Sequence, residues 1–122
     1  MKHESAEGHV SGRATYTDEQ RPPTGMLSVF PVQAPHAHAR ILSLDASAAL
    51  RVAGVHAVLT AADVPGENDT GPIIHDEPLI PRDTVQFFGQ AVAWVVADDE
   101  RIAELAARQV EVRYEALPAC LT

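Results

Sequence analysis

Short apolar stretches separated by turns rich in proline and glycine set the pattern of hydrophobic and polar positions along this chain. Runs of roughly 4 to 8 residues that are rich in β-branched and aromatic side chains, and bounded by such turns, are typical of β-strands. The sequence therefore predicts about six short strands, at residues 26–32, 37–45, 56–59, 85–88, 90–97 and 110–114.

Some of these strands carry a more specific prediction. Residues 90–97 are almost continuously apolar, which is typical of a central strand covered on both faces. Trp94 lies inside this strand, so packing explains it better than stacking on a ligand. The strand at 56–59 is expected to be short and buried. Apolar and charged residues alternate over 110–114, which predicts one buried face.

Two main helices are predicted. The clearer one covers residues 99–108, where apolar residues recur at helical spacing after a candidate N-cap at Asp98. The other covers residues 46–53, between a candidate cap at Asp45 and Gly54, because glycine tolerates the left-handed conformation that ends helices. Two helices and about six strands in a mixed sheet make an α+β domain.

Residues 1–25 differ in composition from the rest of the chain. They are polar and end close to a pair of prolines, which block regular hydrogen bonding. We expect them to form an N-terminal arm, with a helical turn near residues 4–9 and a short strand at 14–16. The domain itself is expected to span residues 26–122.

A long irregular loop is predicted at residues 66–81, which contain three prolines, two glycines and no helical period. Before it, Thr60 and Asp63 have the spacing of a capping pair at the start of a short helix. After it, Gly89 is expected to make a tight turn or bulge.

Composition narrows the functional classes. The chain has 122 residues, 46% of them hydrophobic, which suffices for a single core. The formal net charge of −8 argues against a nucleic-acid partner, because phosphate contacts need clustered cations. The longest apolar run, at 91–97, is far too short to cross a membrane, and residues 1–6 lack the apolar segment of a signal peptide. Cys120 is the only cysteine, which excludes an internal disulfide and suits the cytoplasm.

Candidate catalytic groups are few. His36 and His38 could begin a metal site if they lay on a strand, but no third ligand is evident, so two exposed loop histidines are favoured. His75, Asp76 and Glu77 bring a base and carboxylates together. Adjacent loop residues point in different directions, however, which favours an interface or a solvated turn.

Two further sites contain a candidate nucleophile. Ser5 and His9 would lie one helical turn apart, without a third group to orient them. Cys120 has no basic neighbour to activate its thiol. The sequence therefore predicts no catalytic, cofactor-binding or metal-binding residue in this chain.

Several segments nevertheless resemble a known family in order and spacing. Residues 8–18 carry the pattern Gly-x-x-x-Gly-x-Ala-x-Tyr-x-Asp, which resembles the opening of the large subunits of molybdenum hydroxylases. Residues 38–41, 54–66, 88–93 and 112–118 resemble the portions that follow. The chain is thus similar, over nearly its whole length, to the xanthine dehydrogenase and aldehyde oxidase family.

The resemblance implies an α/β-hammerhead fold at the start of the molybdenum-binding subunit. It also implies that the parent enzyme carries molybdopterin in the rest of that subunit, and iron–sulfur clusters and FAD in other portions. Residues 68–77 are most similar to xanthine dehydrogenases, which implies hydroxylation of xanthine or hypoxanthine in purine metabolism, with oxygen from water and electrons passed to NAD. None of the family's molybdopterin ligands or catalytic residues maps onto residues 1–122.

The long loop is the predicted interface. It is expected to expose Ile73, Ile74, Leu79 and Ile80 among prolines, an apolar content unusual for a solvated loop. With the N-terminal arm, it is expected to pack against the remainder of the molybdenum subunit and the FAD and iron–sulfur portion. The candidate interface residues are Gly66, Asn68, Ile73, Ile74, His75 and Leu79.

Two alternatives stay open on the sequence. One is a free-standing binding or interaction module that uses the same fold, because a fold does not determine function. The other is a small independent enzyme that works through His75, Asp76 or the His36 and His38 pair.

Overall fold

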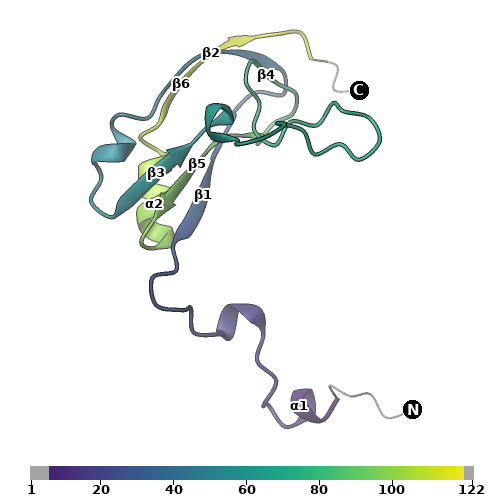
Figure 1. Cartoon of the computed structure of the whole chain (residues 1–122), viewed down its shortest axis with the longest axis vertical. Helices are drawn as coiled ribbons and strands as arrows, with labels where there is room; N and C mark the ends of the chain where they lie inside the picture. The colour runs from purple at the N-terminus through teal and green to yellow at the C-terminus, as the bar shows by residue number, and fades with distance from the viewer. Residues whose placement is uncertain (1–5, 120–122) are drawn as a thin grey trace.

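The computed structural model describes residues 6–119, in which six strands form two antiparallel three-stranded sheets (Figure 1). The first sheet has the order β1 (Ser28–Gln33), β5 (Ala91–Ala97), β3 (Val55–Leu59). The second has the order β4 (Thr84–Val85), β2 (Ala39–Asp45), β6 (Glu111–Ala116). The predicted α+β class and strand number are confirmed. The strands do not form one mixed sheet, since all pairings among the described residues are antiparallel.

One helix packs on the first sheet. Helix α2 (Glu100–Ala107) lies within the predicted range, but its N-cap is Asp99 and not Asp98. The side chain of Asp99 accepts a hydrogen bond from the backbone N–H of Ile102 at 2.7 Å. This bond satisfies one of the amides that the first turn leaves unpaired. The alanines of α2 that face the sheet are buried: Ala103, Ala106 and Ala107.

The second predicted helix, at 46–53, is wrong. The segment forms a turn followed by the short 3₁₀ helix η2 (Ala49–Arg51), and Val52 has already returned to an extended conformation. An isolated helix of this length is marginal because its first turn is costly to form. Asp45 instead closes a local turn, since its Oδ1 accepts a hydrogen bond from the N–H of Ser47 at 2.8 Å. This bond lowers the pKa of Asp45.

The predicted turn residues behave as expected. Gly54 and Gly89 have φ values of +88° and +84°, in the left-handed region that favours glycine. Thr60 caps the 3₁₀ helix η3 (Ala61–Asp63), and its backbone N–H donates to Asp63 Oδ2 at 2.7 Å. This backbone hydrogen bond is the main cause that lowers the pKa of Asp63.

The segment before β1 extends away from the two sheets (Figure 1). It contains a short helix, α1 (Ala6–Val10), and a 3₁₀ helix, η1 (Thr17–Glu19), and an ion pair joins Glu7 to Arg13 at 3.3 Å. The predicted strand at 14–16 is absent, because no second strand lies beside it to complete a ladder. Ser5 and Cys120 lie outside the described residues.

Two strand predictions also need correction. The strand at 85–88 is shorter, since only Thr84–Val85 pairs with β2 before the chain turns at Gly89. The strand at 56–59 is not fully buried, because the side chain of His56 is exposed and Leu59 is 40% exposed.

The core lies between α2, the inner face of the first sheet and the second sheet. Val85, Val92 and Val95 are its largest fully buried side chains. The prediction that the central strand β5 is covered on both faces is wrong, because Trp94 and Val96 keep part of their surface in solvent. No helix among residues 6–119 is long and apolar enough to cross a membrane.

Candidate interface

Side-chain hydrogen bonds order the long loop at residues 66–81, which runs from η3 to β4 without regular secondary structure (Figure 1). At its base, the side-chain amide of Asn68 donates to the carbonyl of Ile80 at 2.6 Å and accepts from the N–H of Ile80 at 3.1 Å. Further out, the N–H and hydroxyl of Thr70 both donate to the carbonyl of Glu77, at 2.7 and 3.0 Å. Two sets of hydrogen bonds therefore connect the outgoing and returning halves of the loop.

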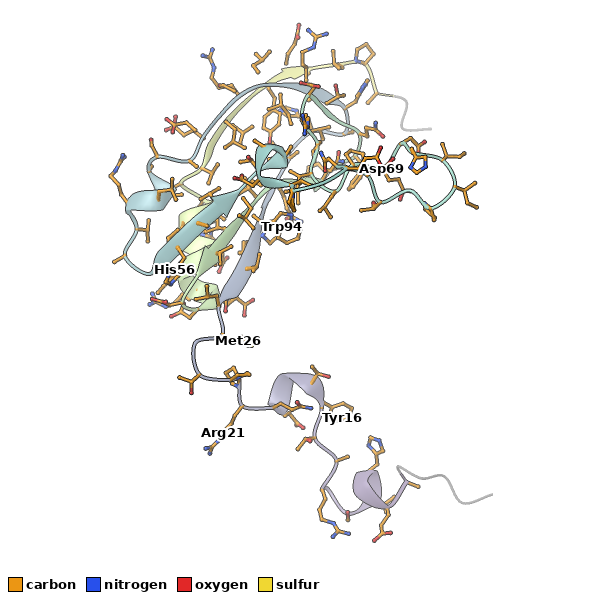
Figure 2. All side chains as sticks on the ribbon, viewed as in Figure 1. Tyr16, Arg21, Met26, His56, Asp69 and Trp94 are labelled. Atoms are coloured by element: carbon orange, nitrogen blue, oxygen red, sulfur yellow. The ribbon has the colours of Figure 1, made fainter. Side chains whose placement is uncertain are left out.

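The end of the loop is built around Asp69 (Figure 2). Its Oδ1 accepts a hydrogen bond from the N–H of Gly71 at 2.7 Å, and its Oδ2 lies 2.9 Å from Nδ1 of His75. The Asp69 side chain is 14% exposed, whereas that of His75 is 72% exposed. A Cβ on Gly71 would lie 1.9 Å from the carbonyl oxygen of Ile74, so this turn requires glycine.

The exposure of the predicted interface residues divides them into two groups. Ile73, Ile74 and Leu79 are 88, 69 and 55% exposed, so three large apolar side chains face solvent on an ordered loop. Ile80, by contrast, is only 4% exposed, because the Asn68 crosslink turns this end of the loop inward.

The remaining candidate interface residues differ in role. Gly66 and His75 are exposed, and Asn68 is partly buried. Asn68 stabilises the loop from within, since both ends of its side-chain amide bond to Ile80. Asn68 therefore stabilises the loop itself, and contact of the six candidates with a partner stays a prediction.

His75, Asp76 and Glu77 do not converge into an acid–base group, in line with the interface or solvated turn that their adjacency favours. His75 is paired with Asp69, six residues away, while Asp76 and Glu77 are exposed. Sequence reasoning missed Asp69 as the partner of His75. The available signal was the Asp-x-Gly spacing, because an aspartate often bonds the backbone two residues ahead in a turn.

His36 and His38 do not converge on a common point. The His36 ring packs edge-on against Tyr114, with 5.1 Å between ring centroids. Nδ1 of His38 lies 2.7 Å from the carbonyl oxygen of Pro118. Within residues 6–119, no group of three or more His, Cys, Asp or Glu side chains is placed to hold a metal ion.

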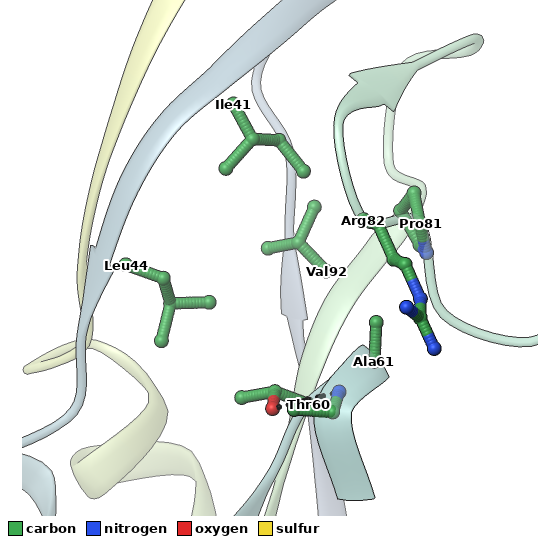
Figure 3. Close-up of a pocket in the computed structure, with 8 residues that line it drawn as sticks. Ile41, Leu44, Thr60, Ala61, Pro81, Arg82 and Val92 are labelled. Carbon is green, nitrogen blue, oxygen red and sulfur yellow. Dashed lines mark hydrogen bonds between the residues drawn. The ribbon is translucent and has the colours of Figure 1, made fainter. Parts of the chain in front are cut away.

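A hollow of about 320 Å³ opens between the two sheets (Figure 3). It is mainly apolar, with Ile41, Leu44 and Val92 on its inner side. Its polar lining is limited to Thr60, whose hydroxyl already bonds Asp63 at 2.8 Å, and Arg82. A large polar cofactor such as molybdopterin needs several convergent polar groups, so these residues do not fit it.

The chain matches a known family of protein domains over most of its length. The family model for the aldehyde oxidase and xanthine dehydrogenase a/b hammerhead domain matches residues 11–118. The chain belongs to this family. Its α/β-hammerhead fold is the one that the sequence resemblance implied.

Among curated proteins, the hammerhead domain is 45% identical to xanthine dehydrogenase of Oryza sativa over 120 residues, which is 98% of this chain. It is 42% identical to xanthine dehydrogenase/oxidase of Mus musculus over 122 residues, the whole chain. In both cases the chain spans only 9% of the relative's length.

Solved structures agree with this assignment. CO dehydrogenase from Oligotropha carboxidovorans matches with a TM-score of 0.88 and 38% identity, over 100% of this chain and 15% of that one. Aldehyde oxidoreductase from Desulfovibrio gigas matches with a TM-score of 0.86 and 36% identity, over 95% of this chain and 14% of that one. The same domain is therefore built into much longer polypeptides.

Proposed function

We propose that this hammerhead domain is a structural and assembly unit of a complete xanthine dehydrogenase. One observation carries the proposal: 45% identity to a xanthine dehydrogenase extends over 98% of the chain. The complete enzyme would hydroxylate xanthine or hypoxanthine with oxygen from water and pass the electrons to NAD. It would work in the cytoplasm, with molybdopterin in the rest of the molybdenum subunit, and iron–sulfur clusters and FAD elsewhere.

The role proposed for this chain is packing and not chemistry. The long loop supports it, because hydrogen bonds between its two halves order the backbone that presents three exposed apolar side chains, Ile73, Ile74 and Leu79. Pre-ordered apolar groups lose little conformational entropy when a partner covers them. We assign residues 1–25 as an arm and residues 26–122 as the domain, and both arm and loop would contact the remainder of the enzyme.

The two alternatives have less support. A free-standing module is not favoured, because the relatives hold this domain within polypeptides about ten times as long, judging from its 9% share. A small independent enzyme would need a convergent site, and His36 and His38 are held by separate partners. His75 has one orienting carboxylate, Asp69, but lies largely in solvent.

Hydrogen exchange tests the proposed interface. The amides of residues 66–81 should exchange at least ten times more slowly in the complete enzyme than in the 122-residue chain. The η2 turn at Ala49–Arg51 provides an internal control, and its exchange should change less. The complete enzyme should also reduce NAD with xanthine, whereas the chain alone should not.

Each part of the proposal can fail separately. Equally fast exchange of the loop in both preparations would remove the loop from the interface. A complete enzyme that oxidises aldehydes but not xanthine would keep the assembly role and overturn the substrate. Turnover by the chain alone would overturn the structural role.

A further inference from the structure

The outer side of the first sheet is apolar over most of its area, with the exposed Gln33 at the end of β1 as a polar residue at its border. The antiparallel register aligns two rows of side chains across its three strands. Each row has one residue from β1, one from β5 and one from β3. The rows are Val29, Val96 and Ala57, and next to it Pro31, Trp94 and Leu59. We call these six residues the outer face.

The opposite face of the same strands is already covered. Val32, Val95 and Ala97 alternate with the outer-face residues and are buried in the core beneath α2. No outer-face residue belongs to that core. Ala57 and Leu59 are two residues apart on β3 and pair with Val96 and Trp94, so they point outward together beyond the bulge at His56.

Solvent reaches this apolar surface. Val29 is 52% exposed and Leu59 is 40% exposed. Trp94 and Val96 are partly exposed even though β5 is the central strand, flanked on both sides. An antiparallel sheet with one solvated face normally carries polar side chains on that face. The six outer-face residues are all apolar or aromatic, polar Gln33 lies only at their border, and they include the chain's only tryptophan (Figure 2).

We propose that the outer face is a second, permanent docking surface, covered by an apolar surface of the remaining part of the same polypeptide. This inference rests on the proposed function. The composition of the face supports it, because a patch of apolar and aromatic side chains without any charge is typical of obligate contacts and not of transient ones. The relatives supply such a neighbour, since the matching residues occupy 9% of their length.

A second copy of the chain fits this face less well. Each copy carries a formal net charge of −8, so two copies repel one another at neutral pH. A neighbour in the same polypeptide, in contrast, is held close by the covalent linkage, and an intramolecular contact does not depend on protein concentration.

Cysteine labelling in the complete enzyme tests the proposal. Leu59→Cys reports on the outer face, and Leu105→Cys on α2 is its matched control, because the two leucines are 40 and 46% exposed. An uncovered outer face predicts similar maleimide labelling rates, read by peptide mass spectrometry and normalised to the urea-unfolded enzyme. The proposal predicts that Leu59→Cys labels at least ten times more slowly than Leu105→Cys.

Val29→Cys on the opposite edge of the sheet provides a second reporter that should show the same protection. Similar rates at all three positions would overturn the proposal. Protection that disappears on dilution would assign the face to a second copy and would also overturn it. Failure of the proposed function gives a different result, namely an enzyme without xanthine turnover or with an unprotected loop.

Discussion

Gly54 occupies a position in this fold that other residues can take only at a cost in stability. It follows η2 with φ at +88°, and a Cβ there would lie 3.0 Å from both Asp98 Oδ2 and Ile102 Cδ1. A left-handed conformation costs a residue with a side chain about 1–2 kcal/mol. Gly54→Ala should therefore lower the free energy of unfolding by about 1–2 kcal/mol, measured by urea titration.

Gly66→Ala is the matched control for that measurement. Gly66 has no positive φ, and its added Cβ would meet no atom within 4 Å. Its free energy of unfolding should stay close to that of the unmodified chain. If the two variants unfolded at the same urea concentration, neither the left-handed backbone nor the crowding at Gly54 would contribute to the stability of the domain.

Residue-level features of this kind were largely predictable from sequence. The left-handed turns at Gly54 and Gly89, and the capping pair of Thr60 and Asp63, depend on neighbours within a few residues. The pairing of Asp69 with His75 was not predicted. Their contact depends on the path of an irregular loop, and no periodicity in the sequence reports that path.

The order of the long loop depends on the hydrogen bonds between the Asn68 side chain and the backbone of Ile80. Asn68→Ala would leave the N–H and the carbonyl of the buried Ile80 without partners. An unsatisfied buried polar group costs about 1–3 kcal/mol. We expect the Ile80 amide to exchange at least ten times faster in this variant, as measured by NMR, while the amides of β5 change little.

Thr70→Val provides the contrast within the same loop. It removes the Thr70 hydroxyl but keeps the backbone N–H that also donates to the carbonyl of Glu77. Exchange at Ile80 should therefore remain nearly unchanged. A Thr70→Val effect as large as that of Asn68→Ala would mean that the loop unfolds as one unit and that Asn68 has no special role.

The predicted elements succeeded where the sequence signal was both long and local. Helix α2 and strands β1, β2, β5 and β6 lie close to their predicted positions. The helix at 46–53 failed because Asp45 bonds Ser47 in a local turn. The division into two antiparallel sheets was also missed, because strand pairing joins residues far apart in the chain and leaves no local pattern.

At the scale of the whole molecule, the resemblance predicted the family, but it did not predict which surfaces of the domain expose apolar side chains. The sequence pointed to the loop as an apolar contact, and the structure places Ile73, Ile74 and Leu79 in solvent. It gave no indication of the outer face. The continuous apolar pattern of residues 90–97 predicts burial on both sides, whereas only the side beneath α2 is buried.

An uncovered outer face and an acidic surface together should make the self-association of the isolated chain depend on pH. Its pI is about 5.0 and its formal charge at pH 7 is −8, so repulsion between copies disappears as the pH falls toward 5. We expect the chain to be monomeric at about pH 8 and to self-associate near pH 5 through exposed apolar surface, as measured by sedimentation velocity.

A double variant identifies the surface responsible. Val29→Thr with Leu59→Thr makes the two most exposed positions of the outer face more polar, whereas Leu105→Thr makes an equivalent change on α2. The double variant should remain monomeric to a lower pH than the unmodified chain, and Leu105→Thr should not. If all three proteins associate equally strongly near pH 5, the loss of charge repulsion alone explains the association, and the outer face does not contribute to it. Loss of association in the double variant alone would instead identify the outer face as the surface through which the isolated chain associates when no neighbour covers it.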